Sequence, residues 1–77
     1  MTKAIVLINS DLGAERDMFN RIKQVPNVTE AHVIYGVYDI IAMVEADSLE
    51  KVKDTITKDL RTLDNIRSTL TMMVVES

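Results

Sequence analysis

The sequence of 77 residues contains no cysteine and a single histidine, His32. Without cysteine the chain has no disulfides and no thiolate ligands, and one histidine argues against a metal site built by the protein itself, so we expect no metal or cofactor. A domain this small buries only about 60% of its unfolded surface and usually needs further stabilisation. Oligomerisation is the source of stability that remains.

The sequence also lacks a large net charge, a glycine-rich stretch and a long apolar run. Charges of both signs are spread along the chain and sum to a net charge of −3, whereas nucleic-acid binding requires a basic stripe, so we expect no direct nucleic-acid contact. No apolar run approaches the roughly 20 residues that span a bilayer, and the N-terminus lacks the pattern of a signal peptide. We therefore expect a cytoplasmic protein without membrane association. Two glycines cannot build a phosphate-binding loop, and no nucleophile and base have catalytic spacing, so we expect no enzyme.

The middle of the chain is predicted to form two strands, Val28–Tyr35 and Ile40–Val44, joined at Gly36–Asp39. Gly36 would supply backbone freedom at the corner, and the Asp39 carboxylate can accept hydrogen bonds from N–H groups of a turn. Asp39 directly precedes a run of apolar residues, where desolvation of an unpaired carboxylate would be costly. Asp39 is therefore the main candidate for a functional residue.

The rest of the chain is predicted to form two further strands and two helices. Ala4–Ile8 is a wholly apolar run typical of a central strand, and Ala14–Gln24 has the helical spacing of an amphipathic helix. Asp47 is predicted to be the N-cap of a second helix, and Thr69–Val75 to be a last strand. The apolar stripe of the second helix consists of Leu49, Val52, Ile56, Leu60 and Leu63.

The order strand, helix, strand, strand, helix, strand is typical of an α+β, ferredoxin-like βαββαβ fold, in which a four-stranded antiparallel sheet has two helices on one face. A sheet with one face in water should show strands that alternate apolar and polar residues. The runs AIVLI, IIAMV and MMVV are instead apolar at both parities. Because both helices cover the same face, we predict that a second copy covers the other in a sheet-to-sheet homodimer.

Several residues have a structural interpretation beside a functional one. His32 is the one candidate general base at neutral pH, but its position on an alternating strand favours the surface or a rim. Met72 and Met73 can line an adaptable pocket, although a strand position favours the core or the dimer seam. For Asp39, the alternative that it is a turn acid bonding the hairpin backbone carries equal weight.

The predicted hairpin carries a pattern that reads Val28-x-Glu30-Ala31-x-x-x-x-Gly36-x-Tyr38-Asp39-Ile40-Ile41. With the apolar strand before it and the leucine-rich helix after it, this pattern resembles the effector-binding domain of the Lrp/AsnC regulators, also called the RAM domain. The resemblance covers essentially all 77 residues. Full-length members carry a helix-turn-helix domain before this one, whereas the first strand here starts close to Met1, so we expect a stand-alone sensing domain.

The resemblance implies a non-enzymatic sensor whose sheet-to-sheet dimers assemble into octamers or decamers. It also implies that an amino acid or a related small effector binds between dimers, and that transcription is modulated with full-length Lrp/AsnC regulators as partners. The Asp39 carboxylate suits an α-ammonium group. The ligand-binding residues implied are Gly36, Val37, Tyr38 and Asp39 of the hairpin, Leu49 at the start of the second helix, and Met72, Met73 and Val74 of the last strand.

The chain departs from the family at two places. The family commonly has Pro-Gly-Val before the last strand, where this chain has Asp64-Asn65-Ile66; Asn65 can replace glycine at positive φ, so we expect the turn to be kept. The unbranched Met72 and Met73 stand at the pocket end of the last strand, so the effector's identity does not carry over from the family.

Two other functions fit the same order of elements. A dimeric α/β-barrel enzyme, of the small monooxygenase or isomerase type, would need a polar residue that faces the cavity between the sheets, and His32 is the candidate. Whether His32 faces the dimer seam or solvent discriminates this alternative. An ACT-like amino-acid-binding module has the same topology but uses a glycine-rich turn after the first strand, which is reduced here to Gly13.

Overall fold

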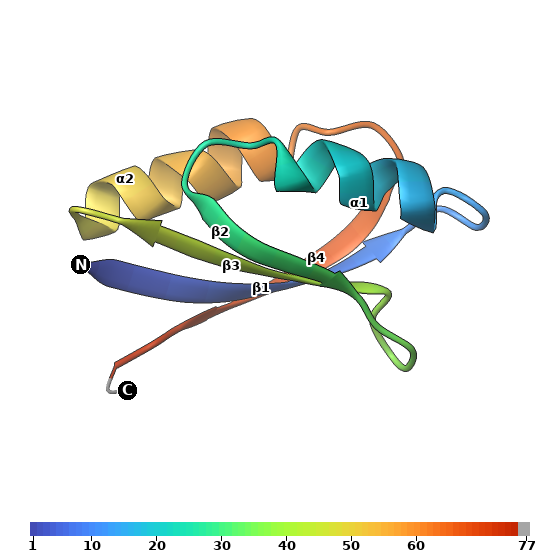
Figure 1. The fold of residues 1–77 in the computed structure, drawn as a ribbon, viewed down its shortest axis with the longest axis horizontal. Helices are drawn as coiled ribbons and strands as arrows, with labels where there is room; N and C mark the ends of the chain where they lie inside the picture. The colour runs from blue at the N-terminus through green and yellow to red at the C-terminus, as the bar shows by residue number, and fades with distance from the viewer. Residues whose placement is uncertain (76–77) are drawn as a thin grey trace.

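The computed structural model describes residues 1–75 and forms an antiparallel four-stranded sheet in the order β2-β3-β1-β4. Both helical segments lie over one face of this sheet (Figure 1). The predicted ferredoxin-like fold is confirmed, whereas the sheet-to-sheet dimer stays a prediction. The elements are β1 (Thr2–Ser10), α1 (Glu15–Lys23), β2 (Val28–Val33), β3 (Ile40–Ala46), α2 (Leu49–Asp54), η1 (Thr55–Leu60), a π-helical continuation of α2, and β4 (Ile66–Met73).

The core lies between the helices and the two central strands, β1 and β3. One parity of each strand is buried beneath the helices, as shown by Val6 and Ile8 of β1 and Ile40 of β3, all with 0% exposure. The other parity is only half-buried. The runs AIVLI and IIAMV therefore occupy the two central strands, β1 and β3, whereas the run MMVV begins in the edge strand β4.

The helices cover this core with one apolar face each. α1 buries Met18 and Ile22, and the second helix buries Val52, Ile56 and Leu60, the middle of the predicted stripe. Leu49 and Leu63 at its ends are exposed and half-buried, respectively. None of the helices in residues 1–75 is long and apolar enough to cross a membrane.

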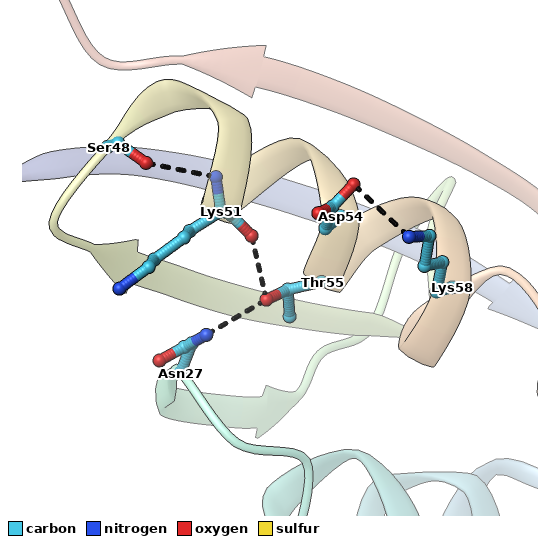
Figure 2. Close-up of polar contacts among 6 residues, drawn as sticks. All are labelled: Asn27, Ser48, Lys51, Asp54, Thr55 and Lys58. Carbon is cyan, nitrogen blue, oxygen red and sulfur yellow. Dashed lines mark hydrogen bonds and ion pairs between the residues drawn. The ribbon is translucent and has the colours of Figure 1, made fainter.

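The second helix begins one residue later than predicted, because Ser48 and not Asp47 is its N-cap. Ser48 has extended backbone angles, and its Oγ accepts a hydrogen bond of 3.2 Å from the Lys51 N–H (Figure 2). Asp47 instead places its carboxylate 3.7 Å from the Lys51 ammonium group. A second ion pair on this helix joins Asp54 and Lys58 at 3.7 Å (Figure 2).

A buried threonine ties the helix layer to the start of β2. The Asn27 side chain donates a hydrogen bond of 3.0 Å to Thr55 Oγ1, which in turn donates to the Lys51 carbonyl at 3.0 Å (Figure 2). Thr55 is 3% exposed, so these bonds satisfy a hydroxyl that has little access to water. The Asn27 carbonyl accepts from the Glu45 N–H at 2.9 Å, which links the same turn to β3.

The turns confirm one prediction and correct two. Asn65 has a φ of 70°, the left-handed conformation predicted for an asparagine in place of glycine. Gly36 does not adopt this conformation and a Cβ there would meet open space, so the prediction that the corner needs glycine's freedom is wrong for the isolated chain. The last strand begins at Ile66 and not at Thr69, because backbone pairing with β1 extends past the apolar run.

Candidate functional site

Asp39 joins the start of β3 to the end of β1. Its carboxylate Oδ2 accepts a hydrogen bond of 3.1 Å from the Ser10 N–H and lies 3.4 Å from the Ser10 hydroxyl. Its backbone N–H donates to the Ile8 carbonyl at 3.0 Å, and its own carbonyl accepts from the Ile34 N–H at 2.7 Å. The Asp39 side chain therefore bonds the end of β1, and the alternative that it is a turn acid bonding the hairpin backbone is wrong.

Two hollows open beside Asp39 at this end of the sheet. One has a volume of about 430 Å³ and lies where the end of β1, the loop before β3 and the start of β4 meet. The other, of about 660 Å³, lies between α1 and the segment that leaves β2, and includes Phe19 and Tyr35. Asp39 and Glu15 line both hollows, so these two carboxylates form the wall between them.

Hydrogen bonds join the segments of β1 and β4 beside the smaller hollow. The Asp11 N–H donates a hydrogen bond of 2.7 Å to the carbonyl of Asn65, which joins the loop after β1 to the turn before β4. Asn9 Nδ2 donates to Ser68 Oγ at 3.3 Å across the same two strands. These contacts, with those of Asp39, hold the polar groups of the hollow on three strands of one sheet.

The predicted ligand-binding residues fall into two sets within one chain. Gly36, Val37, Tyr38 and Asp39 lie in the loop between β2 and β3, next to the Ile8 end of β1. Leu49 follows the other end of β3, where Ala46 pairs with Thr2.

Met72, Met73 and Val74 lie at that same far end, since Met73 pairs with Ala4 and the Val74 N–H donates to the Lys3 carbonyl at 2.9 Å. At roughly 3.3 Å per residue, the Thr2 end near Leu49 is about 20 Å from Ile8, and Ile5, which is opposite Met72, is about 10 Å from Ile8. A single chain therefore does not bring the two predicted sets together.

The residues of the smaller hollow that were not predicted include three with polar side chains: Ser10, Glu15 and Arg67. They come from the end of β1, the start of α1 and the start of β4, so Arg67 is distant in the sequence from the other two. Asp39 is conspicuous in the sequence because it is an acid directly before an apolar run, whereas the sequence around these three residues carries no comparable signal. In the described part of the chain, no group of three or more His, Cys, Asp or Glu side chains is placed to hold a metal ion.

The helix-free face of the sheet is apolar at its centre. Pairing places Ile5 beside Met43 and Met72, and Leu7 beside Ile41 and Leu70, so these side chains share one face. We call this set the open face: Ile5, Leu7, Ile41, Met43, Leu70 and Met72.

His32 pairs with Ile41 and so lies on the side of the open face, at its margin on the edge strand β2. Its side chain is 61% exposed, and its Nε2 is 3.1 Å from Glu30 Oε1. His32 is therefore a rim residue that contacts an acid of its own strand, and it does not lie at the centre of the face as an active site in the seam would require.

Comparisons with known proteins agree with this architecture. An uncharacterized HTH-type transcriptional regulator of Pyrococcus furiosus is 31% identical over 75 residues, which cover 94% of this chain and 50% of the regulator. The chain thus spans about half the length of this curated relative. The crystal structure of FFRP-DM1 is 36% identical, with a TM-score of 0.92 over 97% of this chain and 100% of that one.

A transcriptional regulator from Neisseria meningitidis, solved as a complex with L-Met, matches with a TM-score of 0.83 over 97% of this chain and 50% of that one. At 12% identity this match shows the fold alone. The model of the Lrp/AsnC ligand binding domain matches residues 3–77. The chain therefore belongs to the Lrp/AsnC ligand-binding domain family.

Proposed function

We propose that residues 1–77 act as one oligomeric sensing domain that binds an amino acid or a related small effector and modulates transcription through Lrp/AsnC regulators. The observation that carries this proposal is the hollow beside Asp39, where an acid held by Ser10 faces a space of about 430 Å³. Small-ligand sites have volumes of roughly 300–1,000 Å³ with a few fixed polar groups. The match of residues 3–77 to the Lrp/AsnC ligand binding domain supports a ligand-binding role.

The open face supports assembly through the sheet. Its members at the β4 edge are well exposed, with Leu70 at 45% and Met72 at 41%, and contiguous exposed apolar patches of this kind mark interaction sites. A second copy of the same face would cover it, because a two-fold axis sets one patch against itself. Further assembly of such dimers into octamers or decamers would place the hairpin of one dimer against another.

The effector site proposed is shared between copies. Asp39 and its neighbours supply the polar group at one end of the sheet, and the far-end residues Leu49, Met72 and Val74 of another copy supply the apolar wall. This arrangement accounts for the separation of the two sets by about 10–20 Å within one chain.

A thermal-shift screen of the protein against the twenty amino acids tests effector binding. A ligand that binds only the folded assembly stabilises it by about 2.7 kcal/mol at a hundredfold excess over Kd. We expect at least one amino acid to raise the Tm, and Asp39→Asn to remove the shift because the amide cannot balance an ammonium charge. Absence of a shift with every amino acid would contradict the proposal.

Sedimentation analysis tests the assembly through the open face. Leu70→Glu places a carboxylate in the apolar patch at its β4 edge, so we expect it to shift the protein towards monomers. Thr71→Glu is the matched control, because Thr71 is an exposed neighbour on the other face of β4. Equal association of the two variants would contradict the open face as the interface.

A further inference from the structure

A β-bulge at the start of β4 sets Arg67 apart from the regular strand. Pairing with β1 places Ser68 opposite Asn9 and Ile66 opposite Ser10, which leaves Arg67 without a partner. A bulge of this kind bends the strand and re-aims a side chain. Here Ile66 packs against the core, while Arg67 is exposed and lines the hollow of about 430 Å³ beside Asp39.

Arg67 therefore brings a cation to a hollow that already contains two acids, Asp39 and Glu15. None of these three groups takes part in an ion pair within residues 1–75, where the paired groups are other acids and cations. Asp39 is positioned through Oδ2 by Ser10. The hollow thus combines a guanidinium group and two carboxylates that do not neutralise one another.

The rim of the same hollow is apolar. Leu12, from the loop after β1, is 97% exposed, and Val37, from the loop before β3, is 85% exposed. Large apolar side chains with this exposure gain from contact with an apolar group of a ligand. The apolar rim and the charged interior together fit a ligand that has charged groups at one end and an apolar group at the other.

We propose that Arg67 binds the α-carboxylate of the effector, that Asp39 receives its α-ammonium group, and that Leu12 and Val37 add to the apolar wall that Leu49, Met72 and Val74 of another copy supply for its uncharged side chain. This inference rests on the proposed function and names the ligand class and the residues that select it. A planar guanidinium group can bond a carboxylate through two parallel hydrogen bonds. Glu15 repels a second carboxylate, so the site discriminates against aspartate and glutamate.

Calorimetric titration with a set of analogues tests the assignment. The probe is the amino acid, among L-leucine, L-isoleucine, L-valine, L-methionine and L-phenylalanine, that gives the largest thermal shift. It is compared with the amine that lacks its carboxylate and with the acid that lacks its amino group. We expect each analogue to bind the native protein about tenfold to a hundredfold more weakly, as the loss of a charged hydrogen bond requires.

The variant Arg67→Ala should weaken binding of the amino acid by a similar factor and leave the affinity for the amine unchanged. Arg61→Ala is the matched control, since Arg61 is exposed at the end of η1 and is not part of the hollow. A second variant, Glu15→Gln, should gain affinity for L-glutamate by about tenfold, a readout that loss of folding cannot imitate.

The outcomes separate this inference from the function on which it rests. If an amino acid binds but Arg67→Ala retains its affinity, the role of Arg67 is overturned and the sensor function stands. If Glu15→Gln gains no affinity for L-glutamate, Glu15 does not select the side chain. If none of the five apolar amino acids binds but another of the twenty does, the inference fails and the proposed function stands; if none of the twenty binds, both fail.

Discussion

Replacing Asp39 with alanine should destabilise the protein as well as affect its ligand. The carboxylate accepts a hydrogen bond of 3.1 Å from the N–H of Ser10, and Ser10 is 4% exposed. A hydrogen bond to a charged group is worth about 1.5–3 kcal/mol, and a buried donor left without an acceptor costs a similar amount. The contact with the Ser10 hydroxyl is 3.4 Å long and adds little.

We therefore expect Asp39→Ala to lower the free energy of unfolding by about 1.5–3 kcal/mol. For a domain of this size, 1 kcal/mol corresponds to roughly 4–8 °C in Tm, so the melting temperature should fall by roughly 6–24 °C. Urea unfolding at one fixed protein concentration measures the change, because association makes stability depend on concentration. The backbone bonds of Asp39 to Ile8 and Ile34 remain, so the fold itself should persist.

Two further variants identify the bond responsible. Asp39→Asn retains an oxygen that can accept from the Ser10 N–H, so it should cost only about 1 kcal/mol. Ser10→Ala removes the hydroxyl but keeps the N–H, and we expect a cost of about 0.5 kcal/mol from a long hydrogen bond. If Asp39→Ala stays within about 0.5 kcal/mol of the native protein, the assigned role of the Ser10 N–H bond is refuted.

Three further predictions concern stability and use the same urea measurement. Leu60→Ala should cost about 2–5 kcal/mol because Leu60 is fully buried, whereas Leu49→Ala, at a position 45% exposed, should cost under about 1 kcal/mol; equal costs would contradict the packing described. Ser48→Ala should cost about 1 kcal/mol as the loss of an N-cap, and Asp47→Ala less than about 0.5 kcal/mol as the loss of an exposed ion pair; the reverse order would restore Asp47 as the cap. Asn65→Gly should be nearly neutral and Asn65→Val should cost about 1–3 kcal/mol at positive φ, so a neutral valine variant would refute the left-handed turn.

The sequence predicts the helices and strands well where the spacing of apolar residues decides, and less well where two neighbouring residues are both suitable as an N-cap. Asp47 and Ser48 are both good N-caps by residue type. The end of β3 at Ala46 decides between them, because Ser48 then has the extended backbone that lets its hydroxyl reach the Lys51 N–H. Such a choice depends on the path of the chain and not on the propensity of either residue.

Of the candidate site, the sequence predicts Asp39 but not the residues around it. Asp39 is conspicuous as an acid that precedes an apolar run, but its partner Ser10 is 29 residues away, and no local pattern connects them. Ile66, Leu70 and Met72 share one parity, so a regular strand would place all three on the open face. The bulge moves Ile66 to the core side and frees Arg67, a change that the sequence pattern does not signal.

The separation of Asp39 from Leu49 and Met72 along the sheet has a thermodynamic consequence. In the proposed shared site, which needs both ends, assembly and effector binding would share one coupling free energy, and each would strengthen the other. The apparent affinity for the effector should then rise with protein concentration, and the effector should promote assembly of dilute protein. A cell containing this domain would thus respond to the product of two concentrations, its own and that of the metabolite.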